Sequence, residues 1–167
     1  LEIARQAAEL GVNRAEVLVC CGGGGLTSGI ALALDTLAPG LRARPVEPEG
    51  FDDVRRSLEA GRIARNSRLS GSICDAIITP QPGNLTFPIM ARLCGPGIAV
   101  SEDEALAAIA AAFNRLRIVL EPGGAVALAA ALFHPAEVTG DAVIAVASGG
   151  NVDPQIFRQA LDRFPTV

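Results

Sequence analysis

Four consecutive glycines lie between an apolar segment and a helical segment, and this junction restricts the fold more than any other feature of the chain. The run Ala15–Cys20 is short and rich in valine, which is typical of a strand buried on both faces of a parallel sheet. Gly22 to Gly25 follow this run, and residues 27–37 then have the spacing of a helix. A buried strand that leads through glycines into a helix is typical of α/β proteins.

Strands and helices are predicted to alternate along the rest of the chain. Apolar runs at 41–46, 97–100 and 142–147 predict strands, and a brief extended run covers 117–120. Helical patterns cover 1–11, 52–60, 84–93, 101–116, 122–133 and 153–163. Ser101 and Glu104 have capping-box spacing, and Asp52 and Asp153 are expected to cap their helices. Since no internal repeat is present, the sequence predicts one α/β domain over residues 1–167, with a doubly wound, mostly parallel sheet flanked by helices.

Composition excludes several classes of protein. Half of the 167 residues are apolar and 19% are charged, which argues against disorder. The net charge of -4 gives no electrostatic reason to expect nucleic acid as a partner. No apolar stretch approaches the roughly 20 residues needed to cross a bilayer. The four cysteines, at positions 20, 21, 74 and 94, lack zinc-type spacing, so we expect buried free thiols in a cytoplasmic protein.

The glycine run is suited to binding a phosphate group. A helix that begins in glycines presents backbone N–H groups without partners, and its dipole adds positive potential. The alternative is a tight turn without a ligand, but four glycines cost backbone entropy that a plain turn does not require. The pattern is neither the dinucleotide fingerprint nor the Walker loop, because the acidic residue of the first and the Gly-Lys-Ser/Thr of the second are missing.

Two other segments follow apolar runs and carry polar side chains. Ser148, Gly149, Gly150 and Asn151 come after the strand predicted at 142–147, so Ser148 is expected near the glycine loop if the two strands are neighbours. Its hydroxyl can donate to a neutral ring nitrogen; the alternative is a simple turn before the last helix. Glu121 precedes a helix, where it either complements the helix dipole or faces the pocket.

Acidic residues gather after the second predicted strand. Glu47, Glu49, Asp52 and Asp53 lie within seven residues, which suits a hard cation such as Mg²⁺, Mn²⁺ or Ca²⁺. The alternative is a solvated acidic loop. The single histidine, His134, is expected in a loop or at a helix C-terminus, and no nucleophile constellation accompanies it. The loop-rich stretch 66–83 is long enough to predict a functional or mobile segment.

Together, these motifs resemble the C-terminal half of the fold-type II pyridoxal-phosphate enzymes, specifically the serine/threonine dehydratases and serine racemase. The resemblance covers nearly the whole chain. It implies that Gly22, Gly23, Gly24, Gly25 and Leu26 hold the phosphate of pyridoxal 5′-phosphate through backbone N–H groups. It also implies that Ser148 bonds the pyridine nitrogen, with Glu121, Gly149 and Asn151 at the cofactor. In racemase-like members, Glu47, the Phe51 carbonyl and Asp53 match the positions that hold a divalent cation.

The chain departs from this family at two points. Phe51 replaces the small residue that is usual at its position, which a carbonyl ligand tolerates, and the second departure concerns the lysine. All 14 of its basic residues are arginine, so it contains no lysine. The family bonds the cofactor covalently through a lysine in its N-terminal half, so no catalytic residue is assigned here and the chain alone is expected to be inactive.

The resulting expectation is the C-terminal large-domain portion of an enzyme that converts L-threonine or L-serine to a 2-oxo acid and ammonia. The missing N-terminal half, or another chain, would supply the lysine. A homo-oligomer is also expected, because the sheet edge would be exposed. The alternatives are a non-catalytic binding module or partner subunit, a serine racemase-type enzyme and a nucleotide-binding α/β domain.

Overall fold

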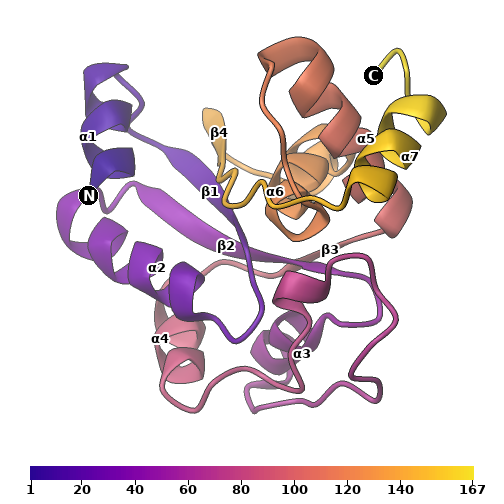
Figure 1. The fold of residues 1–167 in the computed structure, drawn as a ribbon. Coiled ribbons are helices and arrows are strands. Elements are labelled where there is room, and N and C mark those ends of the chain that lie inside the picture. Colours follow the sequence, from indigo (N-terminus) through magenta and orange to yellow (C-terminus); the bar gives the residue numbers. More distant parts are fainter.

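The computed structural model describes residues 1–167, whose centre is a sheet of four parallel strands. The strands are β1 (Ala15–Cys20), β2 (Leu41–Pro48), β3 (Ile98–Val100) and β4 (Ala142–Ala145), in the spatial order β3-β2-β1-β4 (Figure 1). Within the sheet, Cys20 lies beside Val46 of β2, and Leu18 lies beside Ala145 of β4. Because all strands run the same way, their carboxyl ends meet at one edge of the sheet, where α/β proteins bind ligands.

Helices connect the strands. They are α1 (Glu2–Glu9), α2 (Gly25–Leu37), α3 (Asp53–Ala60), α4 (Thr86–Leu93), α5 (Glu102–Ala111), α6 (Pro122–Phe133) and α7 (Pro154–Arg163). Two 3₁₀ turns, η1 (Asp75–Ile77) and η3 (Pro135–Glu137), and a π turn, η2 (Ala112–Leu116), complete the regular structure. None of these helices is both long enough and apolar enough to span a bilayer.

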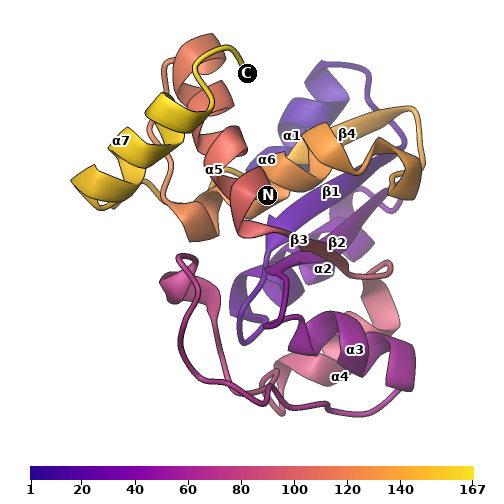
Figure 2. The ribbon, with the colours of Figure 1, turned by 90° about the vertical axis from the view of Figure 1, so that its right-hand side faces the viewer.

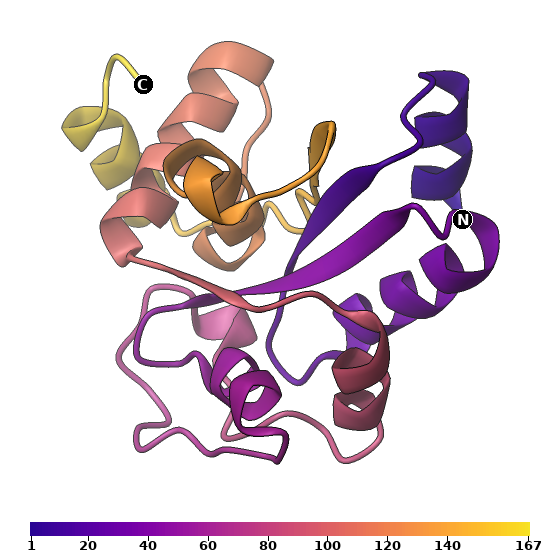
Figure 3. The same cartoon turned by 180° about the vertical axis from the view of Figure 1, so that it is seen from behind.

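The helices cover both faces of the sheet, and alternate residues of β1 show this directly. Val17 and Val19 belong to a core with residues of α1, α2 and α4, whereas Leu18 and Cys20 belong to a core with α5, α6 and α7. Figures 2 and 3 show α5, α6 and α7 on one side of the sheet and α1 and α2 on the other. The predicted doubly wound α/β fold with a parallel sheet is therefore confirmed. The four buried, free thiols are also as predicted.

Several boundaries differ from the prediction. α2 begins at Gly25, inside the glycine run, because Gly24 serves as its N-cap with a left-handed φ of 88°. The helix predicted over 101–116 ends as α5 at Ala111 and continues as the π turn. The extended run predicted at 117–120 joins no strand, and Arg117 has a left-handed φ of 59°.

Two of the three predicted helix caps are confirmed. Ser101 and Glu104 form the capping box, and the Asp153 side chain accepts from two N–H groups in the first turn of α7. Asp52 occupies the N-cap position of α3 but makes no capping bond, so that prediction was wrong. Its carboxylate instead binds Arg55 and Arg56, while Glu47 at the end of β2 supplies the cap.

Candidate functional site

The glycine loop presents a row of free backbone donors at the start of α2. None of the N–H groups from Gly22 to Thr27 donates to an acceptor within the chain, whereas Ser28 N–H begins the helical ladder by donating to Gly24. The start of α4 holds the loop in place, because the Gly23 carbonyl accepts from the Gly83 N–H at 3.0 Å and from the Thr86 hydroxyl at 2.5 Å. Free N–H groups at a helix N-terminus form an anion-binding arrangement.

The four glycines of the loop are required for two different reasons. A Cβ at Gly22 would lie 2.7 Å from the Ile77 carbonyl oxygen, and one at Gly24 would collide with the Met90 side chain. A Cβ at Gly23 or Gly25 would meet no protein atom within 4 Å. Protein packing therefore accounts for glycine at 22 and 24, and open approach to the loop is the remaining reason for glycine at 23 and 25. This arrangement fits a bound phosphate.

The segment between α3 and α4 forms the other wall of the site. A cavity of about 240 Å³ is lined by Cys20 to Thr27 together with Ala76, Ile77 and Thr79. The buried Thr79 hydroxyl has no hydrogen-bond partner. Sequence reasoning missed these three residues, and the length of the loop at 66–83 was the only signal for them. Figure 2 shows this segment rising toward α7.

Ser148 lies beside the glycine loop, as expected for neighbouring strands. Its Oγ atom is 2.9 Å from the Sγ atom of Cys20, the last residue of β1. The two residues meet because β1 and β4 pair in parallel, with Val146 N–H donating to Leu18 at 3.0 Å just before Ser148. The structure thus brings together two segments that are far apart in the sequence.

Glu121 is fastened to the segment that carries Ser148. Its backbone N–H donates to the Gly149 carbonyl at 2.9 Å, and its carboxylate accepts from the Asn151 N–H at 3.1 Å. A Cβ at Gly124 would lie 2.6 Å from the Gly149 carbonyl oxygen, so glycine permits this close approach. Glu121 and Asn151 line a second cavity of about 400 Å³, to which Ser72, Ile73 and Asp75 also contribute.

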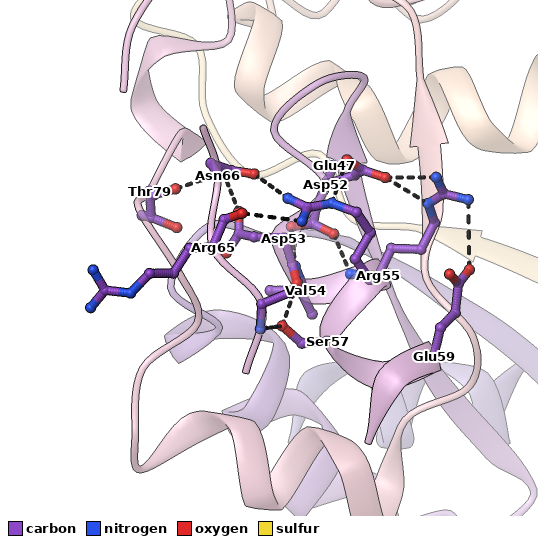
Figure 4. Close-up of polar contacts among 12 residues, drawn as sticks. Glu47, Asp52, Asp53, Val54, Arg55, Ser57, Glu59, Arg65, Asn66 and Thr79 are labelled. Atoms are coloured by element: carbon purple, nitrogen blue, oxygen red, sulfur yellow. Dashed lines mark hydrogen bonds and ion pairs between the residues drawn. The ribbon is translucent and has the colours of Figure 1, made fainter. Parts of the chain in front are cut away.

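Acidic residues at the end of β2 and at the start of α3 form a buried polar network that anchors α3 (Figure 4). The Glu47 carboxylate accepts from the Val54 and Arg55 N–H groups at 2.8 and 2.7 Å, and burial raises the pKa of Glu47 to about 8 although both bonds oppose the rise. Burial likewise raises the pKa of Asp53 to about 6. One Asp53 oxygen accepts from Asn66 at 2.5 Å, and the other is buried without a partner.

The network differs from an all-side-chain metal centre. The chain has no group of three or more His, Cys, Asp or Glu side chains arranged to hold a metal ion. Phe51, the third residue of the predicted cation site, is fully buried, and its carbonyl accepts no hydrogen bond within the chain. The guanidinium of Arg68 lies 5.2 Å from the centre of the Phe51 ring. A cation here would depend on two carboxylates and one carbonyl.

His134 lies at the C-terminus of α6, as predicted, and away from the glycine loop. Its two ring nitrogens are 3.2 Å from a Glu104 oxygen and 2.9 Å from a Glu137 oxygen. The histidine therefore joins the end of α6 to the start of α5.

Comparison with known proteins identifies the class to which this fold and site belong. Residues 1–149 match the sequence profile of the family described as "Pyridoxal-phosphate dependent enzyme", and the chain belongs to this family. Among curated relatives, it is 37% identical over 144 residues to a serine racemase of Dictyostelium discoideum. It is 33% identical over 149 residues to an L-threonine ammonia-lyase of Thermotoga maritima. The alignments cover 84% and 88% of this chain, and 44% and 36% of those proteins.

Solved structures give the same result in three dimensions. A threonine deaminase from T.th. superimposes with a TM-score of 0.85 and 41% identity, covering 91% of this chain and 55% of that one. Maize serine racemase superimposes with a TM-score of 0.81 and 30% identity, covering 97% of this chain and 49% of that one. The fold is therefore that of the fold-type II pyridoxal-phosphate enzymes, and the chain spans less than half the length of the curated relatives described above.

Proposed function

We propose that this chain supplies the phosphate-binding and ring-binding part of a pyridoxal-phosphate-dependent ammonia-lyase. The reaction removes water from L-threonine or L-serine and yields a 2-oxo acid and ammonia. The observation that carries the proposal is the row of free N–H groups from Gly22 to Thr27, which lies beside Ser148 at the carboxyl ends of two neighbouring strands. When bound, pyridoxal phosphate supplies the electron sink for a negative charge at the substrate α-carbon.

In this proposal the chain's own residues hold and tune the cofactor. Gly22 to Leu26 bind its phosphate through backbone N–H groups, and Ser148 donates to the ring nitrogen. A hydroxyl partner leaves that nitrogen without a proton, whereas a carboxylate partner would favour the protonated form. The weaker electron sink that results suits elimination rather than transamination. Glu121, Gly149 and Asn151 keep the Ser148 segment in place through their mutual hydrogen bonds.

The covalent link to the cofactor has to come from elsewhere. The sequence contains no lysine, so we propose that an N-terminal half of the enzyme or a second chain provides the lysine amine and the remaining wall of the substrate site. We also propose that the enzyme is cytoplasmic. The proposed position of this chain within the enzyme is its C-terminal, large-domain portion.

A divalent cation at Glu47, the Phe51 carbonyl and Asp53 is a further part of this proposal. It is supported by the buried Asp53 oxygen without a partner and by the raised pKa values of both carboxyl groups. A cation in contact with these carboxylates would replace the protons that burial favours.

Racemisation of serine is the second candidate activity, and similarity to the Dictyostelium racemase favours it. The two reactions are distinguished by their products. An enzyme completed with its lysine-bearing part yields pyruvate and ammonia from L-serine if it is a lyase, and D-serine if it is a racemase. A non-catalytic binding module would yield neither product.

Cofactor binding tests the site directly. We expect the 167-residue chain to bind pyridoxal 5′-phosphate more tightly than pyridoxal, because only the first carries the phosphate. Gly23→Ala and Gly25→Ala should remove most of this preference without loss of folding. Gly29→Ala is the matched control, because its Cβ also meets no atom within 4 Å but lies one turn into α2. Equal affinity for the two ligands would contradict the proposed phosphate site.

A further inference from the structure

The contact between Cys20 and Ser148 joins two residues of which only the serine has a role in the proposed function. The Cys20 Sγ and Ser148 Oγ atoms lie 2.9 Å apart, a hydrogen-bonded pair in which either atom could donate. Ser148 is exposed, and its side chain makes no other hydrogen bond within the chain. Cys20 also lines the cavity over the glycine loop. The thiol is therefore the single protein group that restrains the serine hydroxyl.

A hydroxyl has one proton and two acceptor lone pairs, so two arrangements of this pair are possible. If Ser148 donates to the sulfur, its oxygen turns a lone pair toward the cofactor. If Cys20 donates to the oxygen, the Ser148 proton is free to point away from the sulfur. Only the second arrangement gives an unprotonated ring nitrogen a donor.

The surroundings of Cys20 favour its neutral, donating form. The residue belongs to the apolar core that also contains residues of β3, α5 and α6, and 6% of its surface is exposed. Burial raises the pKa of the Cys20 thiol, the Ser148 hydrogen bond opposes this rise, and the Glu121 carboxylate adds to it. The sulfur therefore retains its proton at neutral pH.

We propose that Cys20 is a positioning residue, whose S–H group donates to Ser148 and thereby leaves the serine proton directed at the ring nitrogen of the cofactor. This inference rests on the function proposed above. A side chain at position 20 without a donor would leave the Ser148 hydroxyl free to rotate. The hydrogen bond to the ring would then lose its orientation.

The test compares two ligands that differ at a single ring position. Pyridoxal 5′-phosphate has an acceptor nitrogen there, and its 1-deaza analogue has a C–H group instead. Because both carry the same phosphate, the ratio of their dissociation constants reports the bond from Ser148. We expect wild type to favour the nitrogen-containing ligand by roughly threefold to tenfold, the typical net effect of one hydrogen bond. Ser148→Ala should bind both ligands equally.

Substitutions at Cys20 then separate positioning from packing. Cys20→Ala and Cys20→Val both remove the donor, and the valine keeps most of the side-chain volume. In both variants, the logarithm of the ratio of the two dissociation constants should fall to less than half of its wild-type value. Cys20→Ser restores a donor and should keep the preference. Cys94→Ala is the matched control, since Cys94 is an equally buried free thiol that lies in the other core. Thermal unfolding of each variant shows whether the domain is folded.

The possible outcomes distinguish the role of Cys20 from the ring contact of Ser148 and from the proposed function. A preference that is intact in both Cys20→Ala and Cys20→Val but absent in Ser148→Ala overturns the role of Cys20 and leaves the proposed function standing. A wild-type chain that binds both ligands equally removes the ring contact of Ser148 and the role of Cys20 with it. A wild-type chain that binds neither ligand overturns the proposed function itself.

Discussion

The carboxylate of Glu121 accepts a hydrogen bond from the backbone N–H of Asn151 at 3.1 Å. This bond fastens the N-terminus of α6 to the segment that follows β4, and it does so next to Ser148. Because Glu121 links two segments that are separate in the sequence, it contributes to the shape of the site as well as to the stability of the fold.

Glu121→Ala should therefore affect both properties. The Asn151 N–H group loses its acceptor but is exposed to water, so we expect the free energy of unfolding to fall by about 0.5–1.5 kcal/mol. Affinity for pyridoxal phosphate should fall as well, because Ser148 is held less firmly. Thermal unfolding and ligand titration measure the two effects. Glu9→Ala is the control, since Glu9 is exposed and forms a surface ion pair with Arg5. Unchanged stability and affinity would show that the Glu121 bond is dispensable.

Gly24→Ala should destabilise the fold through two separable causes. The residue has a left-handed φ of 88°, and a Cβ would collide with Met90. We expect a loss of about 1–3 kcal/mol, measured by denaturant unfolding. Adding Met90→Ala creates room but keeps the backbone strain. The cost of Gly24→Ala should accordingly be smaller in the Met90→Ala background than in wild type, and an equal cost would leave backbone strain as its sole cause.

His134 should make stability depend on pH near neutrality. Burial lowers its pKa, but the Glu137 and Glu104 carboxylates outweigh this and raise it above the ordinary value of 6.5. The stabilising contribution is therefore complete below about pH 6.5 and is lost as pH rises through the folded-state pKa. We expect His134→Gln to cost up to about 1 kcal/mol at about pH 6 and less at about pH 8.5. Urea unfolding at both pH values checks this, and a pH-independent cost would contradict it.

A divalent cation should stabilise the wild-type chain if the acidic network binds one. We expect millimolar Mg²⁺, Mn²⁺ or Ca²⁺ to raise the unfolding temperature, because binding to the native state alone shifts the folding equilibrium. Asp53→Asn should abolish the increase. Asp103→Asn is a control for general charge effects, as this aspartate is paired with Arg163 on the surface. The same increase in both variants, or no increase in wild type, would remove the cation from the proposal.

The free edge of the sheet should promote self-association. β4 pairs only with β1, and Val143 on β4 is 45% exposed. An exposed edge strand offers unpaired backbone groups and apolar side chains to another copy of the chain. We expect size-exclusion chromatography to show a concentration-dependent oligomer that Val143→Lys shifts toward monomer. A wild-type chain that elutes as a monomer at all concentrations would contradict this expectation.

Sequence reasoning succeeded where local chemistry decides the structure. The strand, glycine and helix pattern predicted the loop from Gly22 to Gly25, and the parallel sheet then required Ser148 to lie near it. The cap by Asp153 could also be predicted, because the carboxylate and the N–H groups of Gln155 and Ile156 lie within three residues of each other.

The remaining parts of the site depend on contacts that no local pattern encodes. Glu47 caps α3 from the end of a strand, and Asp52 is diverted to two arginines that follow it. The loop that carries Thr79 is placed by Asn66, whose side chain donates to the Asp53 carboxylate and to the Thr79 carbonyl. Such positions are set by tertiary packing, so the sequence showed only that this loop is long.

The pairing of β1 with β4 also determines when the pocket can exist. Cys20 and Ser148 stand 128 positions apart in the 167-residue sequence, so most of the domain lies between them. Contacts between residues so far apart in the sequence form slowly, because the entropy of closing the intervening loop is lost before the contact stabilises the chain. On the ribosome, the glycine loop is translated well before its partner strand. The contact with Ser148 therefore becomes possible only after the segment that follows β4 has been made, later than the glycine loop itself.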